Sequence, residues 1–170
     1  MIYPNQICAR KYRLGIPPMI FTHFCQCIIH TFQYRYLKIS DGQFATFEEN
    51  YDPSNGVGFQ NSVSFSYDYD NNILVCSETI TFLQNEKIIL KFGLNSHFLI
   101  HPDSVKLLIH EGVLCLSKEI LWQFASLNYG SMRGVLYERT KETELNSLIL
   151  PPFFFDQLIK DGIHFIKKAK

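Results

Sequence analysis

The chain has 170 residues with no net charge, and 46% of them are hydrophobic, which excludes a disordered polypeptide. A single domain of this length buries roughly 70% of the surface of its unfolded chain and needs no disulfides. Aromatic residues make up 15% of the chain, more than a small two-layer core requires, and this excess favours a binding groove.

The charges are unevenly distributed. Residues 1–40 hold five basic residues and no acidic one, whereas residues 41–111 hold ten acidic and three basic residues. The remaining residues, 112–170, hold eight basic and six acidic residues. A central acidic block does not favour a nucleic-acid partner. It is either the solvated face of strands or a docking surface for a basic protein partner.

Residues 1–31 are interpreted as an N-terminal extension. Within it begins an apolar segment, 16–32, that also contains prolines, histidines and a glutamine. Spanning a bilayer takes about 20 apolar residues, and a secretory signal ends in a small-residue cleavage site, so the segment fits neither. It is either an amphipathic arm that packs on the domain or the product of an upstream start codon, with Met19 as the internal alternative.

The cysteines indicate a reducing environment. Their number is odd and no signal-peptide pattern precedes them, which favours free thiols in the cytoplasm. They are Cys8, Cys25, Cys27, Cys76 and Cys115. Two of them lie between His23 and His30, but this spacing matches no usual zinc loop. We therefore expect no bound metal.

Alternating apolar and polar residues predict four strands. The first begins at Phe32, and Asp41 and Gly42 are expected to end it. A long aromatic connection follows, and loops of such length tend to be functional. The connection covers residues 43–58, and the other strands cover 63–69, 73–83 and 86–101. Gly93 predicts a bulge or bend in the last of these, and Glu78 shares the apolar face of the third.

The second half of the chain is predicted to be helical. Residues 105–109 form a short helix or strand, and Ser117 is a suitable N-cap for a long helix. Gly130 and Gly134 in that helix suggest close approach of another helix or strand, because glycine there costs roughly 1 kcal/mol. Pro152 is expected to start a second, short helix. Three consecutive phenylalanines follow it, and they cannot all face one core.

This order predicts an α+β fold. A four-stranded antiparallel sheet is followed by one long and one short helix, packed on one face. Hairpins join the second, third and fourth strands, and the long connection lets the first strand cross over to lie beside the fourth. The domain covers residues 32–166, and residues 167–170 form a basic C-terminal tail.

The element order and several motifs resemble the SecB family of protein-export chaperones. Pro152 followed by Phe155-Asp156-Gln157-Leu158 is similar to the start of that family's second helix, although Phe154 replaces the usual asparagine. The strand segment 90–100 is similar to the family's fourth strand. The first-helix stretch 121–125 lacks the family's proline and arginine, and the C-terminus is basic where the export chaperones carry an acidic tail.

The resemblance implies a non-enzymatic, cofactor-free holdase that binds unfolded preproteins. Such chaperones are cytoplasmic homotetramers that take part in protein transport and hand clients to the SecA motor ATPase for translocation. Specialised relatives instead serve toxin–antitoxin systems and bind antitoxin-like clients. An adaptor that binds one specific folded partner is the third possibility, and promiscuity of binding distinguishes it from a holdase.

The resemblance also implies two sets of site residues. The client groove lies between the long connection and the second helix, although each ring is alternatively a core residue of this domain. Its candidate residues are Phe44, Phe47, Tyr51, Phe59, Phe153, Phe154 and Phe155. The docking surface for the motor corresponds to Asp41, Glu48, Leu83 and Glu86.

An enzyme is the alternative class. The chain contains no nucleophile elbow, phosphate-binding glycine loop, metalloprotease helix motif or dinucleotide-binding glycine motif. His97, His101 and Asp103 at one strand end are weak candidates for an acid–base or metal site. We interpret them as ordinary core or surface residues, and we expect no catalytic residue.

Overall fold

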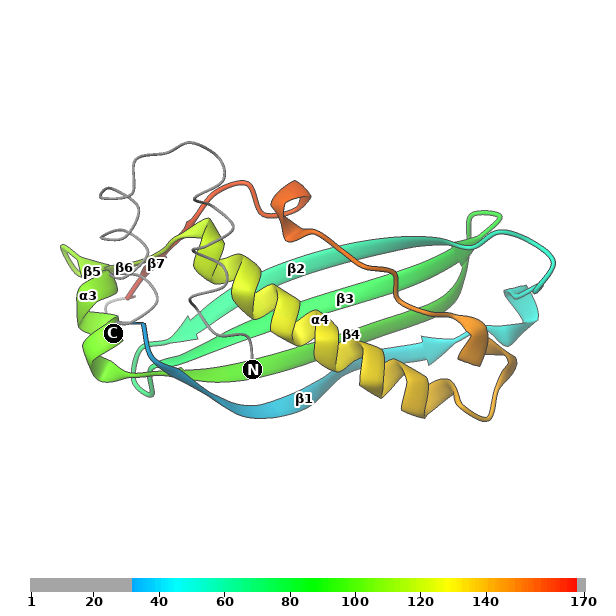
Figure 1. Cartoon of the computed structure of the whole chain (residues 1–170), viewed down its shortest axis with the longest axis horizontal. Helices are drawn as coiled ribbons and strands as arrows, with labels where there is room; N and C mark the ends of the chain where they lie inside the picture. Colours follow the sequence, from blue (N-terminus) through cyan, green and yellow to red (C-terminus); the bar gives the residue numbers. More distant parts are fainter. Residues whose placement is uncertain (1–31, 168–170) are drawn as a thin grey trace, which may run out of the picture.

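The structure, a computed structural model, describes residues 32–167. They form an α+β domain in which helix α4 crosses one face of a four-stranded antiparallel sheet (Figure 1). The predicted fold class is confirmed. The strands of this sheet are β1 (Tyr34–Thr46), β2 (Gly58–Asp68), β3 (Ile73–Gln84) and β4 (Lys87–Ile100).

The strand order is β1-β4-β3-β2, so the first strand does lie beside the fourth. Residues 47–57, which contain the 3-10 turn η2 (Glu48–Asn50), carry the chain from β1 across to β2 at the opposite edge. Tight hairpins then join β2 to β3 and β3 to β4, as alternation and turn residues predict. The sheet therefore has β1 and β2 as its two edges.

The first strand does not end at Asp41 and Gly42. It continues to Thr46, and the register of its pairing with β4 shifts between Asp41 and Phe44. A Cβ atom on Gly42 would lie 2.9 Å from the carbonyl carbon of Gly93. The two glycines thus allow the backbones of β1 and β4 to approach closely, and the expected turn is a bulge.

The helical half contains elements that the sequence did not reveal. Helix α4 begins after Ser117 as predicted, but the expected second helix is a single 3-10 turn. A Cβ atom on Gly162 would lie 2.5 Å from the Leu116 carbonyl oxygen, so the chain passes close to β6 and is extended there. The elements are α3 (Pro102–Leu108), β5 (Ile109–His110), β6 (Val113–Leu116), α4 (Lys118–Thr140), η3 (Glu144–Ser147), η4 (Phe155–Gln157) and β7 (Ile163–Ile166).

The core lies between α4 and the inner face of the main sheet. Every second residue of β3 and β4 is buried there, including Leu74, Phe92 and Phe98. Leu121 and Phe124 of α4 cover them. Burying apolar area at roughly 25 cal/mol per Å² makes this layer the main source of stability.

The two glycines of α4 are not explained by packing inside the domain. A Cβ atom on Gly130 or on Gly134 would meet no atom within 4 Å. The expected close approach of another helix or strand is therefore absent within the described part of the chain.

The extension over residues 1–31 and the tail residues after Lys167 lie outside the described residues. The same holds for the histidine–cysteine cluster near the N-terminus. No helix within residues 32–167 combines the length and apolar character needed to cross a membrane.

Candidate functional site

The free edge of β2 borders a groove. Among the described residues, β2 pairs only with β3, so its other side leaves backbone N–H and C=O groups without strand partners. The chain following η4 runs along this edge, and the space between them measures about 300 Å³. Its walls are Ser62, Val63, Ser64 and Phe65 on one side and Leu158, Ile159, Lys160, Asp161 and Ile163 on the other. We call this space the β2 groove.

Apart from the segment after η4 that runs beside it, the β2 edge lacks most of the devices that normally protect an edge strand. It contains no lysine, arginine or proline, and its register with β3 is free of bulges. The β1 edge, in contrast, carries Arg35, Lys38 and two register shifts. The accessible edge is therefore suited to pairing with another extended backbone.

An aromatic cluster lies at the Phe59 end of β2. The ring of Phe153 lies 6.0 Å from that of Phe59, 5.8 Å from that of Tyr129 and 5.0 Å from that of Phe155. The Tyr129 hydroxyl donates to the Pro151 carbonyl over 2.8 Å, which ties the start of this segment to α4. Burial raises the pKa of Tyr129, so the hydroxyl remains a donor at neutral pH.

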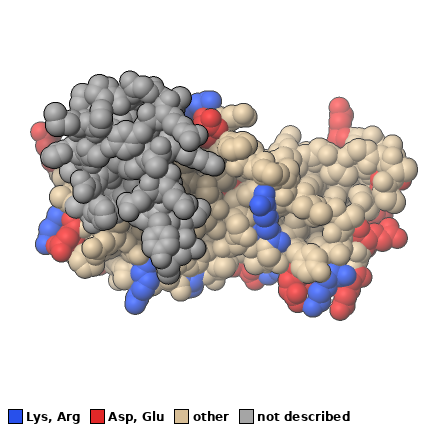
Figure 2. Space-filling view, viewed as in Figure 1, with Lys and Arg blue, Asp and Glu red and all other residues tan. Residues whose placement is uncertain are grey.

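Charged side chains are sparse around the centre of this face. Figure 2 shows uncharged residues over much of the area beside the grey atoms, with a basic side chain near its middle and the other charged side chains mainly at the rim. Such a surface favours contact with apolar segments, because few ions need to be desolvated.

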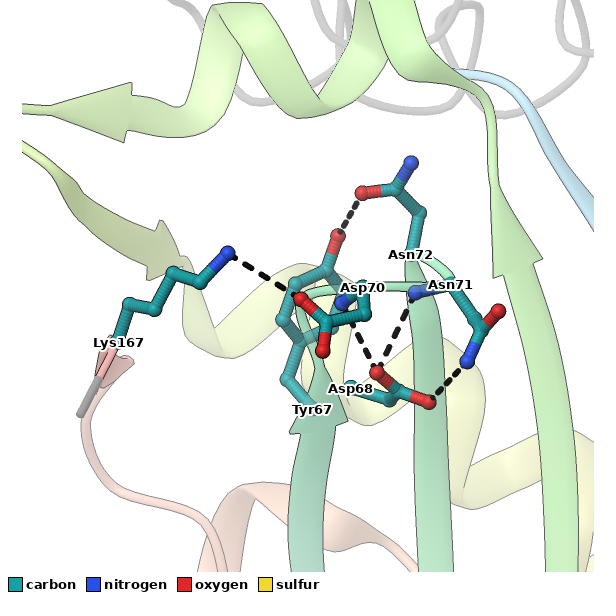
Figure 3. A network of polar contacts seen from close by, with 6 residues as sticks. All are labelled: Tyr67, Asp68, Asp70, Asn71, Asn72 and Lys167. Atoms are coloured by element: carbon teal, nitrogen blue, oxygen red, sulfur yellow. Dashed lines mark hydrogen bonds and ion pairs between the residues drawn. The ribbon is translucent and has the colours of Figure 1, made fainter. Parts of the chain in front are cut away.

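The far wall of the β2 groove is held in place through β7. The Lys167 amine lies 3.2 Å from the Asp70 carboxylate at the β2–β3 turn (Figure 3). The Tyr69 hydroxyl donates to the Phe165 carbonyl. Asp68 accepts hydrogen bonds from Asp70 and Asn71 within the turn. The hydrogen bond from the Asn71 side chain is the largest cause that lowers the pKa of Asp68. The turn is thus an ordered anchor for the end of the domain.

The connection 47–57 is fixed by the side chain of Gln84. The Gln84 amide donates to the carbonyls of Asp52 and Asn55 and accepts from the Asp52 N–H. Asp52 also binds the hydroxyl of Ser54, and this hydrogen bond holds the pKa of Asp52 below its usual value. The sequence indicated a functional loop here, but its anchor on β3 was not predicted.

The predicted groove residues divide into separate groups. Phe59, Phe153 and Phe155 come together, but Phe155 is only 4% exposed and belongs to the core. Phe154 is 74% exposed beside them. Tyr51 contacts the Ser147 hydroxyl through its own hydroxyl, at 2.6 Å.

The other two predicted groove residues lie on the β1 side of the domain. Phe44 packs against Phe92, and the Arg139 guanidinium lies 5.0 Å from its ring centre. Phe47 is half exposed where the connection leaves β1. Any role of these two rings in client binding requires a surface other than the β2 groove.

The predicted docking residues lie on β1, η2, β3 and the turn that follows β3. Asp41 forms an ion pair with Arg139 at 2.7 Å, and Glu48 is exposed in η2. Leu83 is half-buried in β3 opposite Gly58, and Glu86 is exposed in the following turn. Within the described residues only Asp41 of the three acidic ones forms an ion pair, so the exposed Glu48 and Glu86 remain candidates for contact with a basic partner, and Leu83 offers a half-buried apolar side chain.

A second groove was not predicted from the sequence. It measures about 390 Å³ and lies between the C-terminal half of α4 and the chain after η3. Arg133, Leu136, Tyr137, Asn146, Leu148, Ile149, Leu150 and Pro152 line it. Tyr137 and Ile149 are largely exposed, so their apolar surface is available to a partner. Neither residue stands out in the sequence pattern of its segment.

His97 and His101 have different partners and do not form a shared acid–base centre. His97 bonds to the Ser40 hydroxyl over 2.9 Å, and burial lowers its pKa. The His101 side chain caps the start of α3 by accepting a hydrogen bond from the Asp103 N–H. The Asp103 carboxylate forms ion pairs with the His101 ring and with the Lys106 amine. Within residues 32–167 no three histidine, cysteine, aspartate or glutamate side chains are arranged to hold a metal ion.

Comparison with known proteins gives distant structural similarities. No protein-family model matches the sequence, and no curated protein matches it either. The SecB-like chaperone of Mycobacterium tuberculosis, solved with an antitoxin peptide, has a TM-score of 0.43 and 14% identity. That match covers 71% of this chain and 87% of the other. A Streptococcus agalactiae protein of unknown function has a TM-score of 0.35 and 11% identity, covering 72% and 98%. At TM-scores below 0.5, neither similarity assigns a family or a function.

Proposed function

We propose that this protein is an ATP-independent holdase that binds extended segments of unfolded polypeptides in the β2 groove. The observation that supports the proposal best is the β2 edge, which has no lysine, arginine, proline or bulge and lies beside an aromatic cluster. The resemblance of residues 152–158 to the SecB family points to the same activity.

Backbone pairing at β2 suits a binder that must accept many sequences. Main-chain hydrogen bonds are the same for every residue type except proline, so they give affinity without selecting a sequence. The client's apolar side chains then reach Phe153, Phe154 and the half-buried Phe65 and Ile163. Aromatic rings offer large contact areas and lose little rotamer freedom, which supports tolerant recognition.

The finer parts of the proposal rest on the family resemblance. We propose export-competent preproteins as clients, a SecA-type motor as the receiver and a cytoplasmic homotetramer as the working form. The exposed Leu127 and Tyr137 on α4 support self-association, because they leave apolar surface uncovered in the single chain. Antitoxin-like clients of a toxin–antitoxin system are the alternative within the same activity.

The experiment is a client-aggregation assay without ATP. The wild-type protein should suppress aggregation of a chemically unfolded, unrelated protein. Ser64→Lys places a charge in the β2 groove and should weaken this suppression several-fold, because lysine protects edge strands from pairing. Phe154→Ser should weaken it as well, since it removes exposed apolar area.

The matched control is Ser126→Lys, which adds the same charge at an exposed position of α4 outside the groove. It should hold clients as well as the wild type. Circular dichroism should be unchanged for all three variants. Equal holding by Ser64→Lys and Ser126→Lys would show that clients do not bind at β2, and no holding by the wild type would refute the function.

A further inference from the structure

A carboxyl group is buried at the centre of the contact between the sheet and α4. Glu78 lies on β3, is 1% exposed, and faces the helix among the residues of the core. Its strand neighbours are Val63 on β2 and Leu94 on β4, both apolar. A glutamate in such a place is expensive when ionised, because a buried charge loses its hydration.

The hydrogen-bond partners of Glu78 are neutral amides. The Asn61 amide donates to Oε1 over 2.7 Å, and the Asn128 amide of α4 donates to Oε2 over 3.3 Å. Asn128 also accepts from the Ser96 hydroxyl, which contacts the Tyr36 hydroxyl of β1. The carboxyl group therefore sits in a polar network that joins all four strands of the main sheet to the middle of α4.

The carboxyl group has amide donors around it but forms no ion pair within the described residues. Asn61 Oδ1 is buried and has no hydrogen-bond donor within the described part of the chain. Both oxygens of an ionised Glu78 are acceptors as well. The two amides already donate to both carboxyl oxygens, and these hydrogen bonds lower the pKa of Glu78, so it is the burial of the carboxyl group that favours the neutral acid.

The other titratable groups facing Glu78 stay neutral at physiological pH. They are Cys76, on the same face of β3, and Tyr129 of α4. Burial is the largest cause that raises the pKa of each of these two side chains. The strands on either side, β2 and β4, present Asn61, Ser96 and apolar residues. Arg133 of α4 donates to the Pro151 carbonyl and lies over the Tyr129 ring, and it does not change the pKa of Glu78. Burial raises the pKa of Glu78 to about 7.

We propose that Glu78 is a proton-operated latch between the sheet and α4. When neutral, it accepts the Asn128 hydrogen bond without placing a charge in the core. When ionised, it places an unpaired charge under the helix and loosens it. The next residue of α4 is Tyr129, which carries the contacts to Phe153, Phe155 and Pro151. The latch therefore also controls the aromatic cluster at the groove, and this last step rests on the proposed holdase function.

The sign of the effect follows from linkage between protonation and folding. The folded protein has a higher Glu78 pKa than the unfolded chain, whose value is near 4.5. The stabilisation is complete below pH 4.5 and is lost as the pH rises through about 7. Between pH 5 and 9 the folding equilibrium constant should fall on the order of a hundredfold.

The experiment compares unfolding equilibria of Glu78→Gln, Glu86→Gln and the wild type across this pH range. Glu86 is exposed in the β3–β4 turn, so Glu86→Gln removes the same charge without touching the network. The wild type and Glu86→Gln should lose stability with rising pH, and Glu78→Gln should not. A pH profile of Glu78→Gln identical to that of the wild type would overturn the latch.

A direct titration keeps the test independent of how well Glu78→Gln folds. Carbon NMR of the side-chain carboxyls in the wild type should show one glutamate that titrates near pH 7, absent from the spectrum of any folded Glu78 variant. A carboxyl titrating near pH 4.5 at this position would contradict the proposal. Client holding by the wild type should fall over the same pH range, and holding without pH dependence would leave the latch intact but separate it from the groove.

Discussion

The connection between β1 and β2 depends on one buried side chain, and replacing it offers the sharpest test of how that loop is held. Gln84 is 3% exposed and faces residues 52–55 from the end of β3. Its amide donates to the Asp52 carbonyl over 2.9 Å and to the Asn55 carbonyl over 3.0 Å. Its oxygen accepts from the Asp52 N–H over 2.7 Å. Gln84→Ala removes all three hydrogen bonds at once.

The expected loss follows from the net value of such bonds. Each hydrogen bond contributes about 0.5–1.5 kcal/mol after the exchange with water, so three contribute about 1.5–4.5 kcal/mol. A domain of this size has a total stability of about 5–15 kcal/mol, which makes the loss measurable. If the connection opens separately from the rest of the domain, Gln84→Ala lowers the free energy of this local opening and leaves the free energy of global unfolding unchanged.

Two measurements distinguish these cases. Urea unfolding followed by circular dichroism reports the global free energy, and hydrogen exchange at the Asp52 amide reports local opening. Gln60→Ala on the exposed face of β2 serves as the matched control and should change neither. If Gln84→Ala changes neither the unfolding free energy nor the exchange rate, water replaces the side chain at no cost and the anchoring role is wrong.

Further predictions concern the aromatic residues, the extension and the assembly. Phe155→Ala should lose about 3–5 kcal/mol in urea unfolding, whereas the exposed Phe154→Ser should change by no more than about 0.5 kcal/mol; similar losses would contradict their different burial. Deletion of residues 1–31 should leave cooperative thermal unfolding intact, and its loss would make the extension part of the core. Light scattering should give a homotetramer, and a strict monomer would count against the family resemblance.

Local sequence signals determined most of the sheet. Buried and more exposed residues alternate along β2 and β3, every second residue of β4 from Leu90 to Ile100 is buried, and the turns between these strands carry asparagine or aspartate, so period and turn chemistry agree. The crossover of β1 followed from the length of the connection after it. Helix α4 was equally evident from its apolar spacing and from Ser117 before it. These features depend on residues that are near in sequence.

Other features depend on contacts between distant residues, and only the tertiary structure decided them. The Asp41-Gly42 pair has the chemistry of a turn, but proximity to Gly93 makes it a bulge inside β1. Residues 155–158 begin like a helix, but the chain passes Leu116 and pairs β7 with β6 instead. Among three identical neighbours, packing against Tyr129 and Phe59 buries Phe155, half-buries Phe153 and leaves Phe154 exposed. The local sequence around a residue cannot specify such outcomes, because the residue it packs against lies tens of positions away in the chain.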